Sequence, residues 1–333
     1  MKNPLRHSAT ALAALLALLA LAPAATAAPL DTKGIPADVQ GIAHIDYDQF
    51  SKSAISAALW QKADQKKYEA LKTQFDFDPA KDLSGVTIGF IKPAGESDDP
   101  PAFFGVMRGK FSAEKITAAA KQAGARVTTE GKYTIVENLD LDIGAASQSS
   151  SKNALCVIDS NTLLFAQTKP GLAKVIAAYT GQAKSYAAPA ALGKLGGQTA
   201  RPLILGYFGR DITPDAREGG AMMPVSIPKA DSICFSLAED AQNLLARVRA
   251  DFDDPDDAQQ LQGTLQMLMG FAQMGMAKAG AAPGPRADQA RMVQKLLSNL
   301  QMTLDGTTFD LSCAYPIADL LRAIQARSKL LVE

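Results

Sequence analysis

Three turns constrain the fold of this chain more than any other feature. Segments with the apolar alternation of β-strands are joined by only three residues at Glu130-Gly131-Lys132, Asp159-Ser160-Asn161 and Asp305-Gly306-Thr307. A connection this short joins antiparallel neighbours, because a parallel pair needs a crossover of a dozen or more residues. Longer segments with one apolar face at helical spacing stand between the strands. The sequence therefore predicts an α+β protein with helices packed on a mostly antiparallel sheet.

The predicted elements alternate irregularly along the chain. Strands are predicted at Gly41–Asp46, Val86–Ile91, Ala102–Arg108, Ala125–Thr129, Tyr133–Glu137, Ala154–Asp159, Thr162–Gln167, Pro202–Phe208, Ser232–Leu237, Leu300–Leu304 and Thr308–Ala314. Helices are predicted at Phe50–Thr73, Ala113–Gly124, Gly171–Thr180, Asp240–Phe252, Ala258–Ala279, Ala287–Asn299 and Ile317–Ser328.

An internal repeat suggests two similar halves. Asp159 precedes Pro170 by 11 residues, and Asp305 precedes Pro316 by 11, each within a hairpin–proline–helix sequence. Upstream, FFGVMRGKFSAEKITAAAK and SICFSLAEDAQNLLARVRA both read as strand, turn and helix. We expect an N-terminal half at 28–190 and a C-terminal half at 191–333. The alternative is that strand–turn–helix units recur by chance, as they do in many α+β proteins.

The first 27 residues have the pattern of a secretory signal. Lys2 and Arg6 form a positive start, an Ala/Leu run spans Leu12 to Leu21, and Ala25-Thr26-Ala27 is a small-x-small cleavage site. We expect cleavage after Ala27, a mature chain that begins at Ala28, and a periplasmic or secreted location. No later segment has the roughly 18 uninterrupted apolar residues of a membrane span.

The charge balance argues against two classes of partner, nucleic acid and anionic lipid. Without Lys2 and Arg6, the mature chain carries 32 basic and 34 acidic residues. Such a chain lacks the basic footprint of a nucleic-acid-binding protein and the polybasic patch that binds anionic lipid. The expected partner is an unidentified protein or small-molecule ligand.

Two aspartate-rich segments raise the question of calcium. A calcium loop needs oxygen ligands at alternating positions, glycine near position six and a bidentate carboxylate at position twelve. FDFDPAKDL (75–83) and DFDDPDD (251–257) both fail this test. Asp78-Pro79 and Asp254-Pro255 instead have the residue types of an N-cap followed by the first position of a helix. We predict helix starts there.

Few residues suit catalysis. His44 is the single histidine after cleavage, so a histidine-based triad or imidazole zinc site lacks ligands. Cys156, Cys234 and Cys313 lie within predicted strands without CxxC spacing, which favours core thiols, although one bridged pair remains open. Phosphate-binding GxxxxGK[ST] and GxGxxG motifs are missing as well.

A methionine-rich segment, QMLMGFAQMGMAKAG (266–280), offers a different chemistry. Thioether clusters bind copper(I), and Met267-x-Met269 and Met274-x-Met276 have this composition. On a helix, residues two apart point about 200° apart, so these pairs cannot hold one ion unless the segment unwinds. Core filling or an adaptable groove for a partner fits a helical segment better.

Three short pieces resemble a group of uncharacterised secreted bacterial proteins of unknown function. They are IDYDQFSKSAISAAL (45–59), FDFDPAKDLSGVTIGF (75–90) and GVMRGKFSAEKI (105–116). The resemblance implies duplicated α+β halves and assigns no activity.

The sequence thus predicts an exported soluble binding or envelope accessory protein without conventional catalysis. It identifies no catalytic, metal or cofactor residues and no cofactor. The alternatives are a hydrolase that uses carboxylates such as Asp46, Asp48 or Asp159, and copper(I) binding by methionine. Two carboxylates held in different environments suffice for acid–base catalysis, so the first alternative depends on whether they converge.

Overall fold

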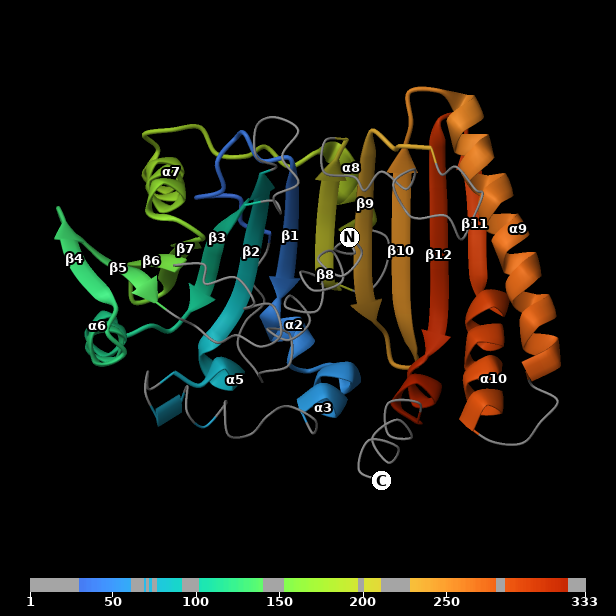
Figure 1. The fold of residues 1–333 in the computed structure, drawn as a ribbon, viewed down its shortest axis with the longest axis horizontal. Helices are drawn as coiled ribbons and strands as arrows, with labels where there is room; N and C mark the ends of the chain where they lie inside the picture. The colour runs from blue at the N-terminus through green and yellow to red at the C-terminus, as the bar shows by residue number, and fades with distance from the viewer. Residues whose placement is uncertain are drawn as a thin grey trace, which may run out of the picture. The chain divides into compact units, whose positions relative to one another are not determined.

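The chain folds into two compact units, residues 1–189 and 190–333. The computed structural model describes residues 30–60, 69, 72–73, 77–91, 102–139, 153–196, 201–210, 228–279 and 285–322. The predicted signal sequence lies outside these residues. All strand pairings in both units are antiparallel among the described residues, and helices pack on the strands, so the predicted α+β class is confirmed (Figure 1).

Unit 1 contains a sheet with the strand order β1-β2-β3-β7-β6-β5-β4. Its strands are β1 (Gly41–Asp46), β2 (Leu83–Ile91), β3 (Ala102–Gly109), β4 (Arg126–Glu130), β5 (Tyr133–Leu139), β6 (Asn153–Asp159) and β7 (Thr162–Ala166). Apolar side chains from the central strands are almost fully buried, among them Ile42, Val86, Val106 and Leu164. The turns at 130–132 and 159–161 connect antiparallel neighbours, as predicted.

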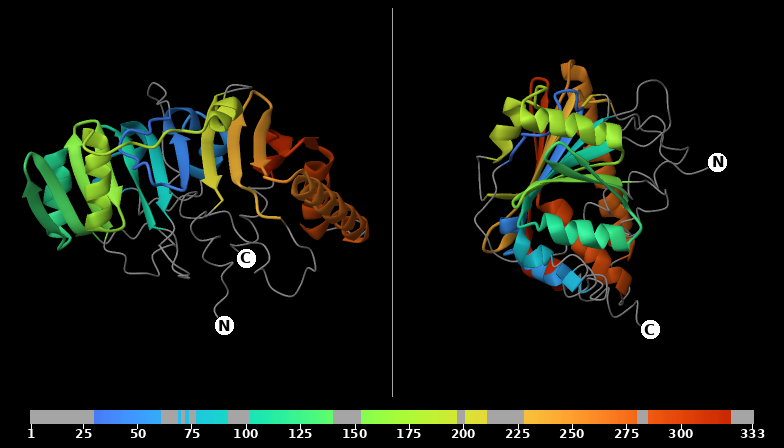
Figure 2. Two further views of the ribbon diagram at one scale, coloured as in Figure 1. Left: turned by 90° about the horizontal axis from the view of Figure 1, so that it is seen from above. Right: turned by 90° about the vertical axis from the view of Figure 1, so that its left-hand side faces the viewer.

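Helices cover both faces of the unit 1 sheet. They are α2 (Tyr47–Phe50), α3 (Ala54–Trp60), α5 (Pro79–Asp82), α6 (Ala113–Gln122) and α7 (Lys169–Thr180). The helix α7 packs on β3, β6 and β7, whereas α6 packs on β4 and β5. Figure 2 shows α6 and α7 on opposite sides of these strands. Leu172 and Val175 of α7 are fully buried, which is the apolar stripe that the sequence predicted.

Unit 2 has the strand order β8-β9-β10-β12-β11. Its strands are β8 (Pro202–Gly209), β9 (Ser232–Glu239), β10 (Asn243–Asp251), β11 (Leu300–Asp305) and β12 (Thr308–Pro316). Its helices are α8 (Ala190–Gly196), α9 (Pro255–Ala279) and α10 (Pro285–Ser298), and residues 317–322 are helical as well. A cluster around Phe252, Ala258 and Phe309 forms the core beneath α9.

The two units share their strand order and one detail of register. In unit 1, β1-β2-β3-β7-β6 corresponds to β8-β9-β10-β12-β11 in unit 2. Thr162, three residues after Asp159, lies opposite Arg108 of β3, and Thr308, three residues after Asp305, lies opposite Asp251 of β10. This agreement is what a duplication requires. The duplication itself stays a prediction.

Three glycines allow phenylalanine rings to lie across the strands. Gly89 faces Phe104, Gly105 faces Phe165 and Gly206 faces Phe235 as direct cross-strand partners. A Cβ atom on Gly206 would lie 2.1 Å from Cζ of Phe235, and one on Gly105 would lie 2.8 Å from Cζ of Phe165. The aromatic ring occupies the space that the glycine leaves, a device that restores packing at strand glycines.

One predicted helix is wrong. The sequence predicts a helix at Asp240–Phe252, but residues 243–251 form β10, which pairs with β9 and β12. The Asp240 carboxylate accepts the backbone N–H groups of Gln242 and Asn243 at 2.7 and 2.6 Å, which makes a tight turn between β9 and β10. Arg247 and Arg249 alternate with small apolar residues, and this period of two is the signal for a strand.

Other boundaries differ less. Of the helix predicted at Phe50–Thr73, the structure forms α2 and α3 up to Trp60, and most of the remainder lies outside the described residues. The short helix α8 has no counterpart among the predicted elements. The helix predicted at Ile317–Ser328 is present at 317–322, and its remainder lies outside the described residues.

The two aspartate–proline pairs begin helices, as predicted. The Asp78 carboxylate accepts the Ala80 N–H at 3.1 Å, and Pro79 is the first residue of α5. Asp254 accepts the Asp256 N–H at 2.9 Å, and α9 begins at Pro255. In both places, the carboxylate satisfies an N–H group that the first helical turn leaves open.

Candidate functional site

Two of the three carboxylates that could serve a hydrolase, Asp46 and Asp159, lie far apart. Asp46 and Asp159 lie at opposite ends of one row of directly paired residues across unit 1: Asp46, Gly85, Arg108, Thr162 and Asp159. Four strand spacings separate them, which amounts to about 19 Å. An acid–base pair must meet around one substrate, and this separation is too large for that.

Each of these carboxylates has a local structural role or position. Asp46 caps α2 by accepting the Gln49 N–H at 3.0 Å. Asp48 lies within α2 and is 1% exposed. Asp159 accepts the Asn161 N–H at 2.8 Å in the β6–β7 turn. The carboxylates of Asp46 and Asp159 therefore stabilise a helix start and a turn.

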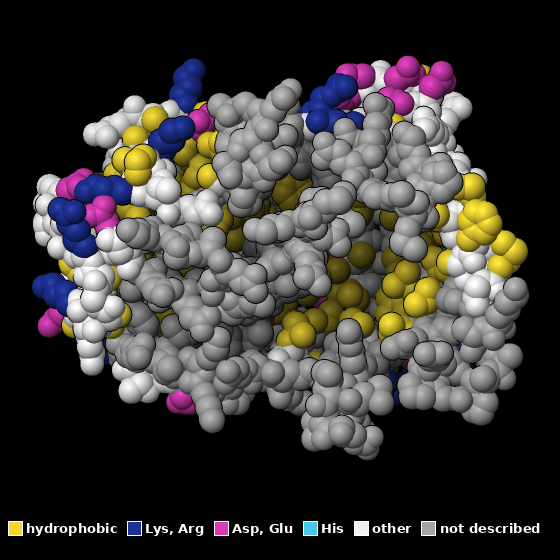
Figure 3. Space-filling model, in the orientation of Figure 1, with side chains coloured by type: hydrophobic (Ala, Val, Ile, Leu, Met, Phe, Trp, Pro, Cys, Tyr) yellow, Lys and Arg dark blue, Asp and Glu magenta, His cyan; other side chains and the backbone are white. Residues whose placement is uncertain are grey.

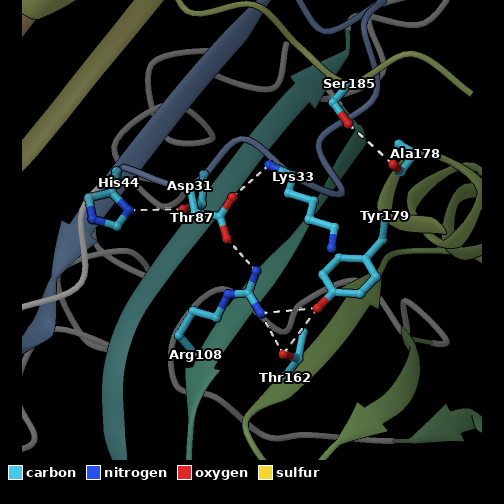
Figure 4. A network of polar contacts seen from close by, with 9 residues as sticks. All are labelled: Asp31, Lys33, His44, Thr87, Arg108, Thr162, Ala178, Tyr179 and Ser185. Carbon is cyan, nitrogen blue, oxygen red and sulfur yellow. Dashed lines mark hydrogen bonds and ion pairs between the residues drawn. The ribbon is translucent and has the colours of Figure 1, made fainter. Parts of the chain in front are cut away.

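His44 is held inside the β1–β2 pair. Its side chain is buried, and Nδ1 lies 2.8 Å from Oγ1 of Thr87, its direct cross-strand partner (Figure 4). A lone histidine in a strand, without a second one to complete a site, is expected to be partly exposed, and this expectation is wrong because every residue of β1 is buried. In this bond the imidazole is oriented by a threonine hydroxyl, whereas the histidine of a catalytic triad is oriented by a carboxylate.

The three cysteines are free thiols. Cys156 of β6 and Cys234 of β9 are buried, and Cys313 of β12 is partly exposed. Burial raises the pKa of the Cys156 thiol to about 12 and that of Cys234 to about 11. Protonated thiols are poor nucleophiles and poor metal ligands, so these two side chains behave as small apolar residues.

A polar network on the face of the unit 1 sheet is centred on Arg108. Its guanidinium donates to Oγ1 of Thr162, to the hydroxyl of Tyr179 at 3.3 Å and to the carboxylate of Asp31 (Figure 4). Burial opposes the charge, but the hydrogen bonds to Tyr179 and Asp31 outweigh it, so the pKa of Arg108 is raised. Lys33 lies 4.5 Å from the centre of the Tyr179 ring.

This network is an anchor and not a reaction centre. Arg108 and Thr162 are cross-strand partners on β3 and β7, Tyr179 comes from α7, and Asp31 comes from the segment before β1. Both terminal nitrogens of the Arg108 guanidinium already donate to protein groups, Nη1 to Thr162 and Tyr179 and Nη2 to Asp31. The network joins residues 31–33 to the sheet and to α7. No local sequence pattern indicates it, because its members are scattered over almost 150 positions.

Metal-binding geometry is likewise missing from the described part of the chain. No three His, Cys, Asp or Glu side chains among those residues lie close enough to share an ion. In the methionine-rich segment, the chain is helical throughout 266–279, so Met267 and Met269 point in different directions. Copper(I) binding by these pairs would require the helix to unwind.

The long helix α9 is a further candidate for a functional site. Its inner side packs on β11 and β12, and its Leu261 and Leu265 contact the core cluster around Phe252 and Phe309. Thr264 on the same side is 7% exposed. Packing of this inner face on the core is sufficient to stabilise α9 as part of the fold.

The opposite side of α9 is apolar as well. Met267, Phe271 and Met274 are 43%, 59% and 59% exposed, and hydrophobic side chains gather over α9 at the right of Figure 3. A Cβ atom added at Gly263 or Gly270 would meet no other atom within 4 Å. Scattered exposed apolar residues are ordinary, but a continuous apolar patch usually marks an interaction site. The described helices include none that is both long and apolar enough to cross a membrane.

Comparisons with known proteins add a distant likeness of fold. No family model matches the sequence, and no curated protein matches it. Two of the similar solved structures are crystal forms III and I of TP0453, each 9% identical, with TM-scores of 0.49 and 0.47. The alignments cover 90% of this chain in both cases, and 99% and 98% of TP0453. A likeness this distant carries no argument about function.

Proposed function

We propose that this protein is an exported accessory factor that acts by binding a protein partner and not by conventional catalysis. The observation that supports the proposal is the outer face of α9, where Met267, Phe271 and Met274 are exposed next to glycines with open space above them. Covering exposed apolar area with a partner is favourable, because removing it from water stabilises the complex by about 25 cal/mol per Å².

The composition of this face suits recognition of another polypeptide. Methionine is flexible and polarisable, so it adapts to partner surfaces of different shapes. Phenylalanine supplies a large rigid contact, the kind of residue that dominates binding energy at interfaces. By contrast, the Arg108 network and His44 are paired internally and offer a ligand little unsatisfied polarity.

A photo-crosslinking experiment tests this proposal. A photoreactive phenylalanine analogue replaces Phe271 in one variant and Gln122, an exposed residue of α6, in a control variant. Both are expressed in the native envelope and irradiated. We expect defined protein adducts at position 271 and none at 122. Equal labelling at both positions, or no adduct at 271, would contradict a binding role for α9.

The rival enzymatic function has its own test. Protein purified without chelator is screened against ester, peptide, phosphate and glycoside substrates, and its metal content is measured. We expect neither turnover nor stoichiometric metal. Turnover that is lost in Asp46→Asn or Asp159→Asn, two substitutions that keep the size of the side chain, would establish the carboxylate-dependent alternative.

The proposal includes export. Ala25-Thr26-Ala27 supports cleavage before Ala28, and Arg108 holds Asp31, a residue only three positions beyond that point, against the sheet. The mature chain would thus be anchored close to its own start. N-terminal sequencing of the protein from an envelope fraction should begin at Ala28. A retained Leu12–Leu21 segment would contradict this.

A further inference from the structure

Four residues form a straight line along the outside of α9. Gly263, Met267, Gly270 and Met274 follow the spacing 4, 3, 4, and we call them the outer stripe. At 100° per residue, they fall within roughly 60° of arc on the side of α9 opposite Leu261 and Leu265. This spacing is that of a helix which packs lengthwise against another helix. Glycines in such a line allow two backbones to approach closely, because they have no side chain to hold them apart.

The outer stripe, together with Phe271 on its border, is complementary to itself. If two copies of α9 pack antiparallel around a two-fold axis between residues 270 and 271, Gly270 of one copy faces Phe271 of the other. The same axis places Met267 opposite Met274. Each large side chain then meets a glycine or a flexible methionine, and the helix dipoles run in opposite directions, which is favourable. A two-fold interface requires such self-complementarity, since the same patch serves both sides.

The fold already uses this kind of contact. The Phe235 ring lies over Gly206, and Phe165 lies against Gly105, each as cross-strand partners within one unit. At Gly270, the corresponding space is open, because a Cβ atom placed there would have no other atom within 4 Å. Phe271, 59% exposed, is a ring of the right size for that space on a second copy.

The distribution of charge along α9 favours a second copy of the chain over a membrane surface as the binding partner. From Ala258 to Ala277 the helix has no charged residue, and exposed glutamines, Gln259, Gln266 and Gln273, border the outer stripe at intervals of seven. Amide side chains both donate and accept hydrogen bonds, so the glutamines of one copy can face those of the other without repulsion. A membrane surface fits less well, because four aspartates of 253–257 stand at the start of α9, whereas membrane-bound helices carry lysine and arginine.

We propose that α9 is a self-association surface, through which two copies of the chain pair antiparallel with Phe271 of each over Gly270 of the other. The inference rests on the proposed binding function and names a second copy as the partner. One helix pair buries less area than the about 1,600 Å² of stable complexes, so the dimer is reversible and concentration-dependent.

Sedimentation velocity over a concentration series, from about 1 µM to about 200 µM, tests the association. Two variants address the contact: Phe271→Ala removes the ring, and Gly270→Leu fills the space that the ring needs. Leucine has a higher helix propensity than glycine, so Gly270→Leu does not endanger the helix. The control is Val293→Ala, which shortens an exposed apolar residue of α10. We expect at least tenfold weaker association in both test variants and no change in the control.

Disulfide cross-linking tests the orientation. In a Cys313→Ser background, which removes the most exposed thiol, one preparation carries Met267→Cys and another carries Met274→Cys. Antiparallel pairing brings position 267 against 274 of the other copy, and separates the two 267 positions by about 10 Å along the axis. We expect mixing the two preparations to give at least fivefold more cross-linked dimer than either alone.

The outcomes separate this inference from the proposed function. A wild-type protein that stays monomeric throughout the series overturns the inference, while specific adducts at position 271 with a different protein would leave the proposed function standing. Dimerisation that is unchanged in Gly270→Leu, or greater cross-linking of like cysteines, overturns it as well. The inference is also overturned if the protein stays monomeric, binds neutral phosphatidylcholine vesicles and loses this binding in Phe271→Ala, because lipid would then be what covers α9.

Discussion

The two units place different insertions at the same point of a shared strand order. Between its third and fourth shared strands in chain order, unit 1 inserts α6, β4 and β5, and the two strands extend its own sheet beyond β6. At the corresponding point, unit 2 inserts α9 and α10, and β11 remains the last strand of its order. In unit 1 the inserted β5 pairs with β6 of the sheet, whereas in unit 2 the inserted helices leave an apolar side of α9 exposed. The shared strands form the core of each unit, and the helical insertion carries the surface that we propose for binding.

A second contrast lies within the shared strands. The equivalent threonines Thr162 and Thr308 are bonded by partners of opposite charge, Arg108 in unit 1 and Asp251 in unit 2. Arg108 connects the strands to Asp31, whereas Asp251 also accepts from Ser232 at 3.1 Å. The position is the same but its chemistry differs: Arg108 reaches a segment outside the sheet, whereas the Asp251 carboxylate accepts hydrogen bonds from side chains of its two neighbouring strands.

The largest effect that we predict is that of Gly105→Ala. A Cβ atom there would lie 2.2 Å from the backbone oxygen of Thr87, and β2 would have to move away from β3. We expect unfolding to become easier by about 3 kcal/mol, at the upper end of overpacking effects, as measured by urea denaturation.

Gly206→Ala in unit 2 serves as the matched substitution. The three atoms nearest to its Cβ all belong to the ring of Phe235, which can rotate and is not fully buried, so we expect a loss of about 1 to 2 kcal/mol. Equal losses at the two glycines would contradict the view that backbone contact distinguishes them.

The threonines give the next largest effect. Thr162→Val keeps the shape of the side chain but removes the hydroxyl that accepts from Arg108, at a site only 1% exposed. We expect a loss of about 1.5 to 2 kcal/mol, because a hydrogen bond to a charged group is lost in a buried place. Thr308→Val, where the site is partly exposed, should cost about 0.5 to 1 kcal/mol. Thermal and urea denaturation measure both, and a larger loss at Thr308 would reverse the comparison.

We predict that the carboxylate of Asp240 in the β9–β10 turn gives a small, pH-dependent contribution to stability. The backbone N–H groups of Gln242 and Asn243 lower the pKa of Asp240. A carboxylate with a lowered folded pKa adds stability above its unfolded pKa of about 3.9, and this is lost as the pH falls through the folded value. Wild type should therefore exceed Asp240→Asn in Tm at pH 6, and the gap should shrink below about pH 4. A gap that stays constant with pH would exclude this carboxylate as the cause.

Much of the fold was predictable because its signals are local. Three-residue turns, strand alternation and the Asp-Pro helix starts at Asp78 and Asp254 each act over a few residues. The error at 240–252 arose where two adjacent leucines, Leu244 and Leu245, masked the alternation of β10. The Arg108 network joins residues far apart in the sequence, so only the strand register brings them together.

The α9 surface was partly visible in the sequence. The residue types of 266–280 indicate an adaptable methionine segment on a helix, but not which of its residues face outward. Exposure depends on how α9 rotates against β11 and β12, and Leu261 and Leu265 decide this by packing on the core. The 4, 3, 4 spacing of glycine and methionine was the available signal, and it becomes informative once the inward side is known.

The smallest predicted change in stability concerns Phe271, and it separates binding from folding on one helix. At a concentration where the protein is monomeric, Phe271→Ala should alter the free energy of unfolding by less than about 0.5 kcal/mol, because its exposed ring adds little to the fold. Leu265→Ala, on the inward side of the same helix, should cost about 2 kcal/mol through lost packing against the core. Both substitutions favour helix, so propensity does not explain a difference. Denaturation of the two variants side by side measures it. A loss at Phe271 as large as that at Leu265 would mean that the outer face of α9 belongs to the fold, and its apolar residues would then need no partner.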